Sequence, residues 1–156
     1  MDFPDVHAQH CQRASLPCFS CVAFGSYSQV MVNMRHTSAK TVGRGVAVSN
    51  DNGNTFGPIV YDKALISPVC QGSLVTFGGA TYFSNPESTT GRNHIGVRKS
   101  MDNAKTWPSS TIIETGNSAG YSCLVAGPVG HSDKGGILFE SLATGSISFA
   151  TFPLSF

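Results

Sequence analysis

Charged residues are scarce in this 156-residue sequence, and their scarcity excludes some functions. Asp, Glu, Lys and Arg together make up 12% of the chain, and the formal net charge is +1. A protein that binds nucleic acid needs a concentration of positive charge, because contacts to phosphates supply much of its affinity. We therefore expect no nucleic acid among the partners of this chain.

Long apolar runs are missing as well. No run approaches the roughly 18 residues that suggest a membrane-spanning helix, so we expect no transmembrane segment in this chain. The first residues, MDFPDVHAQH, lack the basic start and the apolar stretch of a signal peptide. No segment keeps a sustained helical period, so no helix is predicted.

The five cysteines do not form a clear set of pairs. An odd number spread along the chain argues against a disulfide framework. A Cys18-x-x-Cys21 pair near His10 and Cys11 could form a metal cluster, but zinc sites usually need two such pairs. We therefore expect no metal site.

Glycine, proline and small polar residues are abundant instead. Seventeen glycines and eight prolines, with many Ser, Thr and Asn residues, are typical of short strands joined by turns, and so of an all-β chain. Gly78 and Gly79 lie between two apolar runs and predict a hairpin. The expected strands cover residues 27–34, 43–49, 57–65, 71–79, 80–86, 93–100, 110–116, 120–127, 135–141 and 145–152.

Two segments of the sequence are nearly the same and begin 51 residues apart. SNDNGNTF covers residues 49–56 and SMDNAKTW covers residues 100–107, and both follow a short apolar run. Asp51 and Asp102 can accept backbone N–H groups inside a tight turn, and Gly53 permits a positive φ. A repeat near this period is typical of an array of similar supersecondary units.

The two segments resemble the Asp box, which is the hairpin turn of sialidase β-propellers. The second copy departs from the family at Ala104, where the family usually has glycine. We expect the aromatic residues that end the two boxes, Phe56 and Trp107, to pack between sheets. Asp boxes also occur in propellers that are not sialidases, so they indicate structure more than function.

The resemblance implies a β-propeller, of which this chain supplies a part. A blade takes roughly 40–50 residues and a propeller has about 4–8 blades, so the chain supplies about three blades of a six-bladed sialidase propeller. Three blades cannot close a ring. The chain is then a fragment, which we prefer, or a truncated product, or a subunit that assembles with a partner. The propeller domain is expected at residues 27–156, after an atypical N-terminal segment at 1–26 without clear alternation.

Four side chains at expected strand ends are candidates for a functional site. Arg35 follows the strand at 27–34, and Arg92 lies eight residues before the second Asp box. Tyr121 lies in GNSAGYSCL and Glu140 in GGILFES. A propeller exposes side chains at its axis where its strands end. Taken singly, each of the four could instead be an ordinary surface charge or a packed aromatic.

Together these segments resemble the C-terminal half of an exo-α-sialidase, closest to the animal lysosomal and cytosolic enzymes. The resemblance covers roughly residues 27–156 and rests on CQGSLVTF, YFSNP, the spacing of Arg92 from its Asp box, AGYSCL and ILFES, all in the family's order. The family uses three arginines to hold the sialic acid carboxylate, and Arg35 matches the second and Arg92 the third. Tyr121 matches the nucleophile, and Glu140 matches a Glu that orients the first arginine.

The resemblance also implies a base for the tyrosine. A phenol with a normal pKa of about 10 needs such a base, which in the family is a Glu before Cys-Gln. The nearest match is His10-Cys11-Gln12, so His10 stands where the family has Glu. The first arginine and the acid/base Asp of the family have no match. The chemistry requires no cofactor and no metal.

The implied function is that of a glycoside hydrolase. Its partners are sialylated glycans on glycoproteins, oligosaccharides and gangliosides, and its family works in the cytoplasm or the lysosome. Because several catalytic residues have no match, we expect this chain alone to be inactive. Two alternatives stay open, a non-catalytic propeller that binds sialoglycans and a structural Asp-box propeller without a sugar site.

Four further residues are assigned to structure rather than function. Arg44 and Arg98 are expected to be surface charges. Cys70 and Cys123 lie in apolar surroundings and are expected to be buried strand thiols.

Overall fold

The computed structural model describes residues 20–24, 28–35, 43–127 and 132–156. Within these ranges the chain folds into strands joined by turns, which confirms the all-β prediction. No helix in this part of the chain is long and apolar enough to span a membrane. The strands are β1 (Ser20–Phe24), β2 (Val30–Met34), β3 (Arg44–Ser49), β4 (Val60–Asp62), β5 (Ser73–Phe77), β6 (Ala80–Pro86), β7 (Asn93–Ser100), β8 (Ser109–Val125), β9 (Lys134–Ser141) and β10 (Ser146–Pro153).

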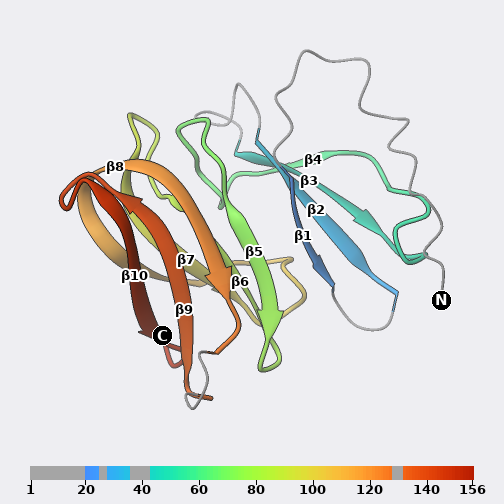
Figure 1. Cartoon of the computed structure of the whole chain (residues 1–156). Coiled ribbons are helices and arrows are strands. Elements are labelled where there is room, and N and C mark those ends of the chain that lie inside the picture. The colour runs from blue at the N-terminus through green and yellow to red at the C-terminus, as the bar shows by residue number, and fades with distance from the viewer. Residues whose placement is uncertain (1–19, 25–27, 36–42, 128–131) are drawn as a thin grey trace, which may run out of the picture.

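The described strands form two sheets in which all neighbours are antiparallel. One sheet has the order β1-β2-β3-β4, and the other has the order β10-β9-β8-β7-β6-β5. Within each sheet, strands that follow one another in the sequence therefore lie side by side, as Figure 1 shows. Such meanders of short antiparallel strands are the building units of propellers.

The first sheet begins earlier in the chain than the sequence pattern predicts. β1 lies in the segment that shows no clear alternation, yet it pairs with β2 along its whole length, with Ser20 opposite Met34 and Phe24 opposite Val30. Residues 20–24 thus take part in this sheet, while the division of the chain at residue 26 stays a prediction.

β4 is shorter than the strand expected at 57–65. Pro58 has no N–H to offer to a ladder, which delays the start of the strand. The strand ends at Asp62, whose carboxylate accepts the N–H of Ala64 at 2.9 Å and turns the chain. By contrast, the hairpin predicted at Gly78 and Gly79 is confirmed, because both have positive φ (58° and 77°), as a tight two-residue turn requires.

β8 is one long strand where the sequence predicts two. Its first part pairs with β7 as far as Asn117, opposite Asn93, and its second part pairs with β9 from Ser118, opposite Ser141. Gly116 (φ +90°) allows the chain to change direction without a break between the two parts. β8 is therefore the last strand of one group and the first strand of the next.

The strands thus divide into about three blades, as expected for a partial propeller. The first blade is β1 to β4, the second runs from β5 to the first part of β8, and the third runs from the second part of β8 to β10. The first strands of neighbouring blades contact each other, β1 with β5 and β5 with β8. The groups lie next to one another in Figure 1.

Two apolar clusters fill the spaces between the blades. The cluster between the first and second blades contains Met31, Leu65, Leu74, Phe83, Ala104 and Trp107. The cluster between the second and third blades contains Ala80, Tyr82, Ile95, Val97, Leu124, Ile137, Phe139 and Phe152. Burial of these side chains supplies the main force that holds neighbouring blades together.

Both Asp boxes fold as the sequence predicts. In the first, the Asp51 carboxylate accepts the hydroxyl groups of Ser49 and Thr55, each at 2.6 Å, and the N–H of Thr55 at 2.8 Å. The second box repeats these bonds around Asp102 with distances of 2.7 to 2.9 Å. These hydrogen bonds favour the ionised form and lower the pKa of each carboxyl to about 2.

The aromatic residues at the ends of the two boxes differ, and the expected packing of Phe56 is wrong. Trp107 is 6% exposed, lies edge-on to Phe83 and donates its ring N–H to Asp62 of the first blade at 3.1 Å. Phe56 is 43% exposed. The reason is positional, since each box faces the blade before its own, and the described residues include no blade before the first.

Candidate functional site

The candidate residues lie at the end of the blades opposite the Asp boxes. Arg35 directly follows β2, and Arg92 directly precedes β7. Tyr121 and Glu140 lie near the Ser118–Ser141 pair, where β8 joins β9. The register of β7 with β8 brings Asn93 next to the same region. Strand ends that are far apart in the sequence therefore meet here.

Tyr121 contacts both Arg92 and Glu140 directly. The backbone N–H of Tyr121 donates to Oε2 of Glu140 at 3.1 Å. The Arg92 Cζ lies 5.3 Å from the centroid of the Tyr121 ring, which places the cation over the ring face. Tyr121 is 37% exposed, so part of the residue is open to solvent. This geometry puts a positive charge, a phenol and a carboxylate on one small surface.

Cys70 and Gly120 form the floor of this surface. Cys70 is fully buried, and its thiol donates to the Gly120 carbonyl at 3.3 Å. Gly120 has φ +99°, and a Cβ at this position would lie 2.8 Å from the Cys70 sulfur and 2.9 Å from the Arg92 Cδ. A side chain here would therefore push apart the groups that the site brings together.

Arg35 joins the site through its charge. Burial raises the pKa of the Cys70 thiol, and the positive charges of Arg92, Arg44 and Arg35 oppose this rise. The guanidinium groups of three arginines thus lie within electrostatic reach of the same buried sulfur. Arg35 itself is half-buried. Tyr121 thus links three of the four predicted residues, and Arg35 lies within electrostatic reach of Cys70 below them.

Arg44 is not the surface charge that the sequence predicts, because it is fully buried. Its Nε donates to the Asn33 side chain, its Nη1 donates to the Cys70 carbonyl at 2.7 Å, and its Cζ lies 5.1 Å from the Phe83 ring centroid. These contacts tie β2, β3 and the segment before β5 together below the site. Arg44 is a structural support that the sequence pattern missed.

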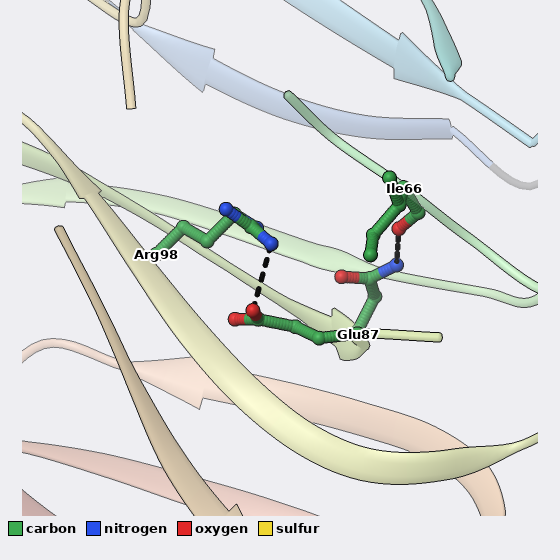
Figure 2. Close-up of polar contacts among 4 residues, drawn as sticks. Ile66, Glu87 and Arg98 are labelled. Atoms are coloured by element: carbon green, nitrogen blue, oxygen red, sulfur yellow. Dashed lines mark hydrogen bonds and ion pairs between the residues drawn. The ribbon is translucent and has the colours of Figure 1, made fainter. Parts of the chain in front are cut away.

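Arg98 is also partly buried rather than a free surface charge. Its Nη2 forms an ion pair with Oε2 of Glu87 at 2.7 Å, and the side chains are 16% and 8% exposed. Figure 2 shows this pair next to a second polar contact, in which Nδ2 of Asn85 donates to the Ile66 carbonyl. Gly96 leaves the room for Glu87, since a Cβ there would lie 2.4 Å from its Oε1.

The Glu87 pair fixes the loop that carries Arg92. The N–H of Glu87 donates to the carbonyl of His94 at 2.9 Å and closes the loop at its base. Burial raises the pKa of Glu87, and Arg98 opposes this rise. Glu87 therefore anchors the start of the Arg92 loop through both its backbone and its side chain.

Some predictions fall elsewhere or are wrong. Cys123 is exposed rather than buried, because it alternates along β8 with Ser122 and Leu124, which are buried. His10, Cys11 and Cys18 lie outside the described residues. Among the residues that are described, no group of His, Cys, Asp and Glu could hold a metal ion.

A groove of about 520 Å³ lies between the first two blades near Ala104, on the Asp-box side and away from the candidate site.

Comparison with known proteins identifies sialidases as relatives. No protein-family model matches the chain. A sialidase of Micromonospora viridifaciens is 36% identical over an alignment of 140 residues, and the match covers 83% of this chain and 21% of that protein. A sialidase of Bacteroides fragilis (strain YCH46) is 32% identical over an alignment of 134 residues, and the match covers 79% of this chain and 23% of that protein.

Solved structures agree with the sequence relatives. The Hadza microbial sialidase Hz136 superposes with a TM-score of 0.75 at 33% identity, over 86% of this chain and 27% of that one. The intramolecular trans-sialidase of Ruminococcus gnavus shares the fold, with a TM-score of 0.71 at 16% identity, over 89% of this chain and 33% of that one. The expected likeness to animal enzymes in particular stays a prediction.

The chain spans about a quarter of the length of the sialidases that it matches. The matches cover about four fifths of the chain itself. By sequence and by fold, this chain is a homologue of one part of a sialidase.

Proposed function

We propose that this chain is part of an exo-α-sialidase that releases terminal sialic acid from glycoproteins, oligosaccharides or gangliosides. The observation that carries the proposal is the contact of Tyr121 with Arg92 and Glu140 in a homologue of sialidases. A cation, a phenol and a carboxylate are the groups that this reaction needs. Here they lie together near the start of the pairing between β8 and β9.

Arg35 and Arg92 hold the carboxylate of sialic acid in this proposal. A guanidinium group stays charged at all ordinary pH values and presents a planar fork that matches a carboxylate. Arg92 is exposed and lies over the Tyr121 ring, so a carboxylate bound there lies beside the phenol. Arg35 adds a second positive charge within electrostatic reach of Cys70.

Tyr121 is the proposed nucleophile. Its phenolic oxygen attacks the anomeric carbon as the phenolic proton passes to a base. The glycosidic C–O bond breaks, and the leaving oxygen takes a proton from the family's acid/base Asp, which has no match in this chain. Water then cleaves the tyrosyl–glycosyl bond, and the two inversions together retain the anomeric configuration. A neutral phenol suits a carbon that carries a carboxylate, because an anionic nucleophile would be repelled.

The chain alone is expected to be inactive, because the first arginine and the acid/base Asp of the family have no match in it. Loss of one member of a catalytic unit commonly lowers the rate by several orders of magnitude. Incubation of the purified chain with a fluorogenic sialoside should release no fluorophore above background. Release at a rate typical of enzymes would contradict this expectation.

Binding tests the site separately from turnover. Titration of the chain with N-acetylneuraminic acid, followed by NMR, should show saturable binding that weakens at least tenfold in Arg35→Ala and Arg92→Ala. Tyr121→Phe should bind as the wild type does. Lys105→Ala, which removes an exposed cation in the second Asp box, is the control and should change nothing. Equal binding by all variants, or no binding at all, would refute the proposed site.

A further inference from the structure

The backbone around Tyr121 is not held by a regular strand ladder. Between the pairs Ser118–Ser141 and Ser122–Phe139, β8 advances by four residues while β9 advances by two. β8 therefore bulges at Tyr121, and such a bulge leaves residues without backbone partners and re-aims their side chains. Something other than the ladder must fix the direction of the Tyr121 side chain.

Two side chains supply the missing partners. Oε2 of Glu140 accepts the N–H of Tyr121 at 3.1 Å, and Oε1 of Gln71 accepts the N–H of Ser122 at 3.0 Å. The first N–H belongs to the peptide before Tyr121, and the second belongs to the peptide after it. Because both peptide planes are held, the direction of the Cα–Cβ bond of Tyr121 is set.

Gln71 is itself firmly placed. Its Nε2 donates to the Gly72 carbonyl at 2.8 Å, so the amide orientation leaves Oε1 free to accept from Ser122. The preceding residue, Cys70, is fully buried, and its carbonyl accepts from Arg44 at 2.7 Å. Gln71 therefore reaches from the second blade to the third from a rigid base.

We propose that Gln71 is a positioning residue for Tyr121. It holds the peptide after Tyr121, and this keeps the phenol over the Arg92 guanidinium. The inference adds to the proposed function, because its importance for catalysis depends on Tyr121 as the nucleophile. The geometric part of the inference stands on the hydrogen bonds alone.

Three variants separate positioning from general stability. Gln71→Met keeps the length of the side chain but removes the acceptor, whereas Gln71→Glu keeps an acceptor oxygen. Ser73→Ala is the matched control, because Oγ of Ser73 accepts the N–H of Leu124 at 2.9 Å. The control loses the same kind of bond to the same strand, three residues beyond Tyr121.

The measurement is NMR of the Tyr121 ring and the Arg92 side chain in the intact chain. Gln71→Met should shift both sets of signals by more than a line width, because the ring moves relative to the cation. Gln71→Glu should return them towards the wild-type positions, and Ser73→Ala should leave them in place. Unchanged signals in Gln71→Met, or equal shifts in Ser73→Ala, would overturn the inference.

This measurement needs no ligand, so it separates the inference from the proposed function. If Gln71→Met moves the Tyr121 and Arg92 signals but the wild type does not bind N-acetylneuraminic acid, the positioning role of Gln71 is supported and the proposed function fails. If the wild type binds the sugar and Gln71→Met moves neither signal, the proposed function stands and the positioning role fails.

Discussion

Gly53 and Ala104 occupy the same place in the two Asp boxes, and both have positive φ, at 88° and 61°. The left-handed conformation costs a non-glycine residue roughly 1–2 kcal/mol. Ala104 offsets this cost by burial, since it is 6% exposed in the cluster between the first two blades. A buried methyl group contributes about 0.8 kcal/mol, so burial offsets about half or more of the strain.

The two positions should therefore respond differently to exchange. Gly53→Ala should destabilise the chain by about 1–2 kcal/mol, because the new Cβ gains little contact in return for the strain. The nearest atom, Cγ2 of Val30, lies 3.9 Å away. Ala104→Gly should change the free energy of unfolding by less than about 1 kcal/mol. Urea unfolding of the two variants measures these changes in the free energy of unfolding. The prediction is contradicted if Ala104→Gly stabilises the chain by as much as Gly53→Ala destabilises it.

Arg44 is an example of a residue whose burial cannot be predicted from the sequence. An arginine between two glycines at the start of a strand has no local feature that predicts burial. Its partners, Asn33 and Cys70, lie on other elements, so only the packing of two blades brings them to the guanidinium. The family resemblance points to Tyr121 and Glu140 as site residues. Their hydrogen bond cannot be predicted in the same way, because it depends on the register of β8 and β9, which no local pattern shows.

At the level of elements, the Asp boxes make the stability of the chain depend on pH. Asp51 and Asp102 have a pKa of about 2 in the folded chain, below the ordinary value of 3.8. The unfolded chain therefore binds protons first as the pH falls, and folding loses stability between about pH 4 and pH 2. Above that window their full contribution is present.

Exchange of both carboxyl groups should flatten this dependence. The double variant Asp51→Asn, Asp102→Asn keeps an oxygen acceptor in each turn but cannot titrate. We expect it to be less stable than the wild type at neutral pH and to lose less stability on acidification. Urea unfolding at pH values from 2 to 7 is the measurement, and parallel curves for both proteins would show that these carboxyl groups do not cause the acid sensitivity.

Glu87, at the start of the loop that carries Arg92, has a pKa shift opposite in direction to those of Asp51 and Asp102. The pKa of Glu87 is raised above its ordinary value of 4.5 by burial, and Arg98 limits the rise. Without the arginine, the folded chain would hold the Glu87 proton more tightly than the unfolded chain does. Stability would then fall as the pH rises above 4.5, because ionisation would leave an unpaired, partly buried charge.

Arg98→Met should therefore destabilise the chain by about 3 kcal/mol at pH 7, with a smaller loss near pH 4. The double variant Glu87→Gln, Arg98→Met should recover much of the stability and lose the pH dependence above pH 4. Thermal unfolding at several pH values measures both effects. A pH-independent loss in Arg98→Met, unchanged in the double variant, would mean that packing of the arginine stem and not its charge supports the loop.

Most strands could be predicted from the sequence, for physical reasons. Turn residues such as Gly78 and Gly79 mark the ends of apolar runs, and the Asp boxes carry their own hydrogen bonds. β8 could not be predicted as one strand, because its continuity depends on a change of partner from β7 to β9. β1 was missed because its pairing with β2 is not visible as a local alternation.

At the level of the whole molecule, the third blade presents an apolar outer face. Phe149 lies opposite Leu138 in the β9–β10 ladder, and Cys123 lies opposite Leu138 in the β8–β9 ladder, so the three share one face. Ile147 lies on the same side of β10 and is 73% exposed, while Phe149 is 55% exposed. Contiguous apolar patches of several hundred Å² are rare on monomers and usually mark an interface.

We expect this face to make the 156-residue chain associate with itself as its concentration rises, because a second copy offers the same apolar surface. Sedimentation velocity at increasing concentration should show a shift from monomer to larger species. Phe149→Lys should suppress the shift, since association would then desolvate an unpaired charge. Met101→Lys adds the same charge at an exposed apolar residue of the second Asp box and should not suppress it. The prediction fails if the chain stays monomeric at all concentrations. It also fails if both variants suppress association equally, because the apolar face of the third blade would then not be the surface that associates.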